Sequence, residues 1–332
     1  MPQYNEFWNP YRFVPRRPGQ LPRRKPQGHH LFNGWLGTID CELEALSSLV
    51  TGQERFTRKR SANNLPVIPG TSLKGVFRSV AEIVGHGCPI VNRDNRCRSS
   101  SSLCAACRIF GYLGRGVHAG HVSISDAVLI ESPVDPTQWE RIKVRFGRPD
   151  PQHKAFYPTD TRLRWHKLYH HQPRRTKPAA YPHGNAREET VEYAPAGSRF
   201  RFSVTVENLS SDDLGLLLYV LELEPGMAHK VGGCKALGAG SSVVRIVDWD
   251  LRRGENRFRT QAAKEEVMEE IGRYKEQYIN DNSETMQALR ALMRWDPNDT
   301  REIRFPDRNW FNRNPQTKLR TWQEYAGRNA RP

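Results

Sequence analysis

Four cysteines within 20 residues form the strongest chemical signal in this chain. Cys88, Cys97, Cys104 and Cys107 have the spacing C-x8-C-x6-C-x2-C. Four thiolates can surround a Zn²⁺ ion tetrahedrally, and a C-x2-C pair is the usual half of such a site. The intervening residues are mostly small or polar and cannot build a core, so a metal would have to supply the folding energy. We predict a structural zinc site, with His86 as an alternative ligand and four unrelated thiols as the competing interpretation.

A second group of candidate residues lies at the start of a predicted helix, in the sequence PGTSLKGVFRS from Pro69 to Ser79. Ser72 and Lys74 fall near its N-terminus, and Arg78 lies one turn further on. The helix dipole disfavours a lysine there by about 0.3–1 kcal/mol. A bound phosphate would reverse that sign, because backbone N–H groups and Lys74 would converge on it. An amphipathic helix with a solvated basic face explains the same residues equally well.

A glycine-rich segment, HKVGGCKALGAGSS, follows at 229–242. Gly232 and Gly233 would allow the backbone to approach a ligand closely, and Lys230 and Lys235 would supply charge. The segment is not a P-loop, since no Gly-Lys-Ser/Thr follows, and a strand rather than a helix comes after it. A flexible hairpin turn is the alternative.

Basic and aromatic residues also alternate in one long stretch, 141–177, which carries 11 basic residues against Asp150 and Asp160. Aromatic faces stack on unpaired bases for about 1–3 kcal/mol each, while cations follow the phosphates. A satellite aromatic cluster under a loop is the competing interpretation. From this stretch and from the polar loop at 51–64 we take as RNA-binding candidates Arg162, Arg164, Trp165, Lys167, Arg55, Arg58, Lys59 and Arg60.

The overall charge agrees with a polyanionic partner. Lysine and arginine number 51 and aspartate and glutamate 36, so the formal net charge is +15. Residues 1–30 carry six basic residues against Glu6, and such clustering favours a nucleic acid across them. No apolar run approaches the roughly 20 residues of a membrane span, and no signal peptide is evident. We therefore expect a cytoplasmic protein without a membrane partner, in which Cys41 and Cys234 are ordinary buried or loop residues.

The elements that must position these residues follow from periodicity. Apolar alternation predicts strands within 31–43, 121–130, 199–206 and 242–247. Helical spacing predicts one helix capped by Thr71 or Ser72 and another opened by a Ser210–Asp213 capping box. Strand, helix, strand, excursion, strand, helix, strand is the order of an elaborated ferredoxin-like or RRM-like α+β domain. We expect a basic arm at 1–30, this domain at 31–250, and a helical extension with a tail at 251–332. The zinc insertion occupies 86–108, a protruding hairpin excursion 147–195, and the extension's helices about 260–279 and 283–294.

Taken together, these motifs resemble the RAMP superfamily of CRISPR systems, most closely its type III-like backbone subunit. The resembling pieces run in family order over about 9–248. They are NPYRFVP at Asn9–Pro15, the first strand, PGTSLKGVFRS, CAACRIFG at Cys104–Gly111, PAGSRFRF at Pro195–Phe202, and GGCKALGAG.

The resemblance implies a subunit of an antiviral ribonucleoprotein that coats a guide RNA. In such subunits the lysine helix, here with Lys74 and Arg78, holds the guide backbone. A protruding hairpin, here the 147–195 excursion, wedges between bases, and the glycine-rich turn lies against the guide. The implied partners are guide CRISPR RNA, complementary target RNA, further copies of the chain in a filament, and other CRISPR effector subunits.

One departure from the family pattern concerns catalysis. RNA-cleaving relatives carry an aspartate in the loop before the lysine helix, but Leu46–Pro66 contains none, and Glu54 is its only acid. We therefore favour a non-catalytic subunit. Two alternatives stay open: a single-strand-binding scaffold outside CRISPR, and an RNA-cleaving subunit or guide-processing endoribonuclease using His29, His30, His166, His170 or His171.

We predict that the guide-bound subunit holds complementary RNA without cutting it. A lone glutamate among four cations is a poor proton acceptor, and arginine stays protonated at neutral pH. The measurement is incubation with end-labelled target RNA and Mg²⁺ or Mn²⁺. Regularly spaced products that disappear in Glu54→Ala would contradict the prediction.

Overall fold

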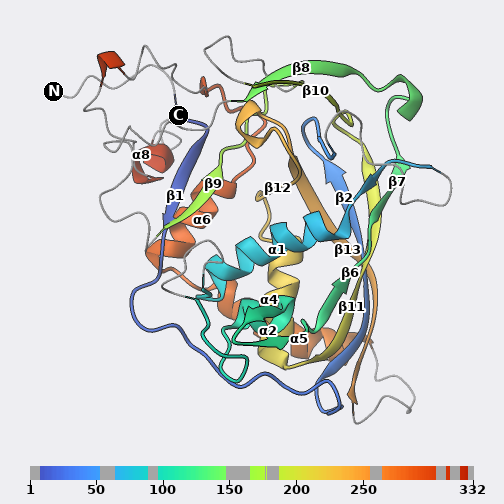
Figure 1. Ribbon diagram of the computed structural model, residues 1–332, viewed down its shortest axis with the longest axis vertical. Helices are drawn as coiled ribbons and strands as arrows, with labels where there is room; N and C mark the ends of the chain where they lie inside the picture. Colours follow the sequence, from blue (N-terminus) through green and yellow to red (C-terminus); the bar gives the residue numbers. More distant parts are fainter. Residues whose placement is uncertain are drawn as a thin grey trace.

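The computed structural model describes residues 8–52, 64–88, 96–146, 165–175, 177, 187–254, 264–303, 312–314 and 322–327. Its centre is a curled antiparallel sheet with strand order β12-β13-β2-β11-β7-β3, in which β6 also pairs with β11 (Figure 1). The predicted α+β class is confirmed. The sheet strands are β2 (Trp35–Ala45), β3 (Val67–Ile68), β6 (Val122–Ile124), β7 (Ala127–Glu131), β11 (Arg199–Leu209), β12 (His229–Lys230) and β13 (Ser241–Arg253).

The two central strands, β2 and β11, show the alternation that the sequence predicted. Ile39 pairs with Val204 and Cys41 with Phe202, and all four side chains are buried on one face. On the other face Glu42 forms ion pairs with the guanidinium groups of neighbouring arginines on β11. The sheet therefore has one apolar face for the core and one charged face.

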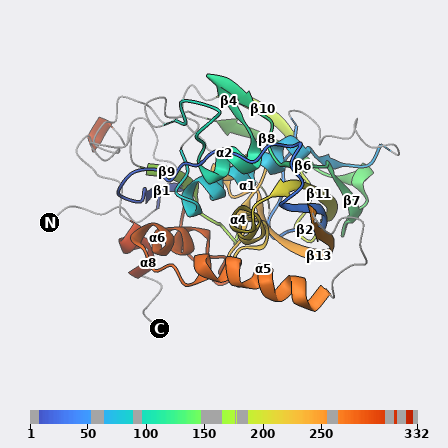
Figure 2. The same ribbon diagram turned by 90° about the horizontal axis from the view of Figure 1, so that it is seen from below.

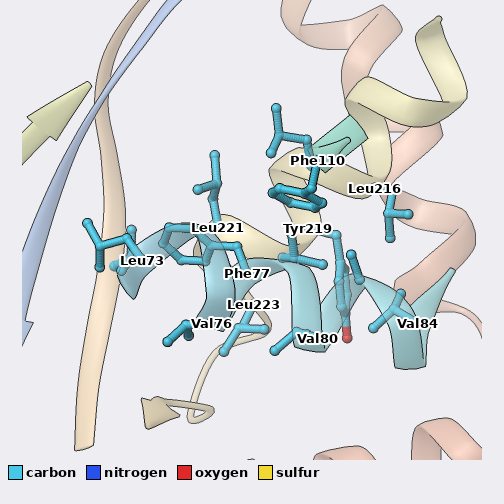
Figure 3. Packing of buried hydrophobic residues seen from close by; sticks show 14 of the residues in the cluster. Leu73, Val76, Phe77, Val80, Val84, Phe110, Leu216, Tyr219, Leu221 and Leu223 are labelled. Carbon is cyan, nitrogen blue, oxygen red and sulfur yellow. The ribbon is translucent and has the colours of Figure 1, made fainter. Parts of the chain in front are cut away.

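Helices α1 (Gly70–Val84) and α4 (Ser211–Glu222) pack against each other on the apolar face. Figure 3 shows the apolar side of α1, with Phe77 at its centre, facing Tyr219 and Leu221. The Phe77 ring stacks on Phe202 of the sheet at a centroid distance of 6.0 Å. The predicted apolar stripe of α1 is thus confirmed as its buried face.

The start of α1 differs from the prediction. The helix begins at Gly70 after Pro69, and neither Thr71 nor Ser72 caps it. Instead the Gly70 N–H donates to Asp126 Oδ1 at 2.8 Å, and a Cβ at Gly70 would lie 2.2 Å from the Ile124 carbonyl oxygen. Asp126 lies where the predicted strand 121–130 breaks into β6 and β7. The break turns this carboxylate toward the helix N-terminus, where it supplies the cap.

The cap of α4 follows the sequence. The Asp213 N–H donates to Ser210 Oγ at 3.3 Å, so Ser210 is the N-cap. The small connecting elements between α1 and β6 are α2 (Ala105–Phe110), β4 (Tyr112–Gly114) and β5 (Gly116–His118).

The arm and the excursion meet in the folded chain. Strand β1 (Tyr11–Pro15) pairs antiparallel with β9 (Trp165–Tyr169), and Tyr11 and Val14 are buried. Strands β8 (Arg141–Phe146) and β10 (Arg187–Glu192) pair as a second ribbon, while 147–164 and 178–186 lie outside the described residues. The sequence missed β9 because WHKLY does not alternate apolar and polar residues.

The predicted helices of the extension are confirmed as α5 (Lys264–Ile279) and α6 (Glu284–Met293), followed by α8 (Trp322–Gly327). Helix α5 packs on α4, and α6 packs on β1 and α1 (Figure 2). Within the described residues, no helix is long and apolar enough to span a bilayer.

Candidate metal centre and nucleic-acid interface

The four predicted cysteines meet in one buried cluster. Cys88 follows α1, Cys104 caps α2, and Cys107 lies within α2. Cys88 Sγ lies 3.5 Å from Cys107 Sγ, 3.6 Å from Cys104 Sγ and 3.7 Å from Cys97 Sγ. Tetrahedral Zn²⁺ with bonds of about 2.3 Å places its sulfur ligands about 3.8 Å apart. The cluster therefore has the spacing that this ion requires, and His86 is not one of its members.

Backbone and side-chain donors surround these sulfurs. Cys104 N–H donates to Cys97 Sγ at 3.2 Å, and Arg78 Nη2 donates to Cys107 Sγ at 3.4 Å. Contacts within the cluster lower the pKa of Cys104 to about 7, chiefly through Cys107, and lower the pKa of Cys97. The same contacts raise the pKa of Cys88 and of Cys107. Four thiolates this close repel one another, and a bound cation would stabilise all four as ligands.

Arg78 belongs to this centre. Besides Cys107, its guanidinium contacts Glu82 Oε1 at 3.1 Å and the Gly111 carbonyl oxygen at 2.8 Å. The guide contact that the resemblance gave Arg78 stays a prediction, but the structure fixes this side chain beside the sulfurs. Lys74, one turn before it, is half-buried, and its pKa is lowered by burial and by the Arg78 charge.

A cleft of about 550 Å³ lies on the other side of α1. The segment 50–52, the N-terminal half of α1, strand β9 and the glycine-rich turn converge on it. None of the described residues that line it is an aspartate or a glutamate. The sequence-predicted residues that it brings together are Ser72, Lys167, Lys230, Gly232, Gly233 and Lys235.

The lysines of the cleft are held in place by their surroundings. Lys167 Nζ lies 3.9 Å from the ring centroid of Tyr11 and 5.0 Å from that of Tyr169. Although this side chain reaches solvent, partial desolvation lowers its pKa to about 8. Lys230 Nζ donates to the carbonyl oxygens of Gly238 and Ala239, and burial with the nearby Lys235 charge lowers its pKa to about 7. Neither ammonium group has a carboxylate beside it from the described lining of the cleft.

The glycine-rich turn is fitted against the protein's own backbone. Gly232 has φ +77°, and a Cβ there would lie 2.1 Å from the Val50 carbonyl oxygen. The Gly233 N–H donates to that same oxygen at 2.8 Å. Contact with Val50 therefore already requires a glycine at 232, and the approach of a ligand to Gly232 and Gly233 stays a prediction.

Several candidates are not positioned here. Arg55, Arg58, Lys59, Arg60, Arg162 and Arg164 lie outside the described residues, and Trp165 is described only as the first residue of β9. In contrast, the sequence did not single out Tyr11 as a contact of Lys167. Tyr11 was noted in the sequence only as part of the NPYRFVP motif.

The arm's charges have partners within the chain. Arg17 forms an ion pair with Asp281, and Arg24 contacts Asp212 at 3.1 Å and Asp213 at 3.3 Å. Arg12 is buried and donates to the carbonyl oxygens of Asn9 and Tyr11. The argument that clustered cations in the arm need an external polyanion therefore fails for Arg17 and Arg24, whose charges are paired with carboxylates.

The candidate catalytic histidines of β9 and its end lie in surroundings that disfavour protonation. Burial lowers the pKa of His166 to about 4 and that of His171 to about 3, and it also lowers the pKa of His170. His171 Nδ1 contacts Ser241 Oγ at 2.8 Å, and its Nε2 lies 3.1 Å from the Ala228 carbonyl oxygen. His171 thus has structural partners, and the lowered pKa values disfavour the protonated form that a general acid needs.

Comparison with known proteins agrees with these features. A family model of the RAMP superfamily matches residues 42–244. The chain belongs to the RAMP superfamily. Among solved structures, it is similar to a chain in the cryo-EM structure of the type III-B Cmr-beta bound to cognate target RNA, with a TM-score of 0.36 and 14% identity. That alignment covers 67% of this chain and 62% of the other, and no curated protein matches.

The RAMP match contains α1, the cysteine cluster and the whole glycine-rich segment 229–242, and it confirms the resemblance seen in the sequence. Strand β1, which supplies Tyr11, and helices α5, α6 and α8 lie outside the matched residues.

We predict that the cysteine cluster holds one zinc ion. The double variant Cys104→Ser, Cys107→Ser should contain one equivalent less zinc than the wild type, because two of four thiolates are removed. Elemental analysis of the purified proteins measures this. The control is Cys234→Ser, which removes a buried thiol outside the cluster. Equal zinc content in the double variant and the wild type would contradict the prediction.

Proposed function

We propose that this RAMP protein is a backbone subunit of a class 1 CRISPR effector ribonucleoprotein. It binds guide RNA independently of sequence and presents it for pairing with target RNA. The observation that carries the proposal is the cleft, where lysines from β9 and the glycine-rich turn face α1 without a carboxylate among the described lining residues. Membership in the RAMP superfamily supports the assignment to a CRISPR complex.

Arginines on the outer face of the sheet are paired with glutamates, which leaves the cleft as the favoured surface for RNA. On the outer face of the sheet Arg199 contacts Glu42 at 2.6 Å and Glu131 at 2.7 Å, and Arg245 contacts Glu44 at 2.9 Å. These arginines are already neutralised, whereas Lys167 and Lys235 line a surface with no acid among its described residues. A phosphate backbone gains most where cations lack a counter-charge.

The contacts available in the cleft do not read bases. Ammonium groups and the hydroxyls of Thr71 and Ser72 bind phosphate and sugar oxygens, which are the same in every nucleotide. Tyr169, which also lines the cleft, offers a ring for stacking, and stacking tolerates every base. Sequence-independent binding is what a protein needs to coat a guide of any sequence, with further copies of itself along the same strand.

We also propose that the core is an elaborated ferredoxin-like domain. Four antiparallel strands in the order β13-β2-β11-β7, with α1 after β2 and α4 after β11, support it. In this assignment the zinc-binding segment is an insertion between α1 and β6, and zinc has a structural role. The lowered pKa values of His166, His170 and His171 do not favour a general acid of an endoribonuclease.

Removing a cleft lysine should weaken RNA binding and its salt dependence. Lys167→Ala and Lys235→Ala should each flatten the slope of log K against log salt by about 0.7 for every phosphate that the variant no longer neutralises. The measurement is fluorescence anisotropy with single-stranded RNA of mixed sequence over a salt series. Lys74→Ala tests in the same way the contact implied by the resemblance.

The matched control for these variants is Arg273→Ala. It removes one positive charge from the exposed side of α5, whose residues do not line the cleft. If all variants keep the wild-type slope, or if Arg273→Ala changes it as much as Lys167→Ala, RNA does not bind in the cleft.

RNA affinity should fall as pH rises from about 6 to 9. The protonated lysine binds phosphate, and the pKa is about 8 for Lys167 and about 7 for Lys230 before RNA binds. A nearby phosphate raises both pKa values, so binding takes up protons and is strongest below them. Lys167→Arg, which stays protonated throughout, should flatten the profile. Anisotropy titrations at fixed salt measure this, and an affinity that rises with pH would contradict it.

A further inference from the structure

Three histidines from separate parts of the chain meet at a second site, which shares no residue with the cysteine cluster. His29 comes from the arm, His118 ends β5, and His121 precedes β6. One ring nitrogen from each lies within 4.8 Å of a nitrogen of the other two. The rings of His29 and His121 stack at 4.4 Å, and those of His118 and His121 are 5.1 Å apart.

Backbone carbonyl groups orient all three rings. His118 Nε2–H donates to the Arg108 oxygen at 2.9 Å, His121 Nδ1–H to the Glu207 oxygen at 2.6 Å, and His29 Nε2–H to the Ala119 oxygen at 3.0 Å. A carbonyl oxygen only accepts, so each of these nitrogens carries the proton. The second nitrogen of each neutral ring then offers a lone pair. Metal-binding histidines are typically fixed in this way, with the other N–H donated to a carbonyl or carboxylate.

Two observations point to a cation between the rings. His121 Nε2 is buried and has no hydrogen-bond partner among the described residues. Glu207 Oε2 lies 3.5 Å from His29 Nδ1, so a carboxylate faces the nitrogen that would carry a lone pair. A metal ion would satisfy the buried nitrogen and would balance the carboxylate.

We propose that His29, His118 and His121 bind a divalent transition-metal ion, with Zn²⁺ as the ion to test, and leave its fourth position to water. Three imidazoles suit zinc, and bonds of about 2.0–2.1 Å would bring the nitrogens to about 3.3 Å from one another. Two ligands are on the core and the third is on the arm, so the ion ties the arm to the domain. The supporting carbonyl of Arg108 is itself fixed, because the Arg108 side chain forms a buried ion pair with Asp213 at 2.6 Å.

The test is zinc binding by the full chain, measured as metal content and as affinity. Wild type should bind two equivalents after addition of Zn²⁺ and gel filtration, one at each site. His29→Ala should bind one equivalent of zinc. Removing an outer-shell partner lowers metal affinity by roughly 10–100-fold, and removing a ligand should lower it further. His29 is exposed and lies on the arm, so its removal does not threaten the core. The matched control is His30→Ala, an exposed neighbour outside the cluster.

Cobalt distinguishes the two sites. Co²⁺ at the cysteines gives intense sulfur-to-cobalt charge transfer, whereas Co²⁺ at the histidines gives only weak d–d bands. His29→Ala should lose the second set and keep the first. Equal zinc content and equal cobalt spectra in His29→Ala and wild type would overturn the proposal, as would a loss of the same size in His30→Ala.

Trypsin provides a readout of the arm itself. Arg23 and Arg24 are exposed and offer cleavage sites. Zinc should slow cleavage there in the wild type and in His30→Ala, but not in His29→Ala. Cleavage at the same rate with and without zinc in the wild type would overturn the tethering role.

Discussion

The buried contact of Phe77 with Phe202 and His229 holds helix α1 on the sheet, and both functional features of the protein depend on that helix. Its N-terminal half presents Ser72 and Gly75 to the cleft. Arg78, one residue after Phe77, reaches the other way to Cys107. One helix therefore divides the proposed RNA-binding surface from the candidate metal centre. A rotation of α1 would move both, and the apolar side chains packed around Phe77 oppose such a rotation.

The cations of this chain fall into two physical classes. Arginines of the arm and of the outer sheet face contact carboxylates of the chain itself, as Arg24 contacts Asp213 and Arg199 contacts Glu42. Lysines of the cleft line a surface whose described residues include no acid, and burial lowers the pKa of Lys230. Charges of the second class oppose folding slightly when the cleft is free, and an anionic ligand stabilises them. A high net charge alone would not have separated the two classes.

Metal ions suit the parts of this fold that have no apolar core of their own. The segment between α1 and α2 is mostly polar, and its described part is held by the four cysteines, by the buried Leu103 side chain and by the Arg78 contact with Cys107. The arm between β1 and β2 likewise lacks an apolar core of its own. There Asn208 Nδ2 donates to the Gly28 carbonyl oxygen at 2.9 Å, next to His29. In both places a few strong ligand bonds would replace the missing hydrophobic burial.

Local patterns in the sequence determined the central strands, the buried face of α1, the Ser210 cap, the helices of the extension and the four clustered cysteines. Each of these depends on a period or spacing of a few residues, which strand and helix geometry impose directly. Tertiary structure alone decided the pairing of β1 with β9, the Asp126 cap of α1, the position of Arg78 at the sulfurs and the meeting of three histidines. These contacts join residues far apart in the chain. Where a side chain could pair with several partners, the neighbouring sequence does not predict which one it contacts. The glycine-rich turn shows the same limit: its glycines were evident in the sequence, but the chain that approaches Gly232 most closely is the protein's own, at Val50.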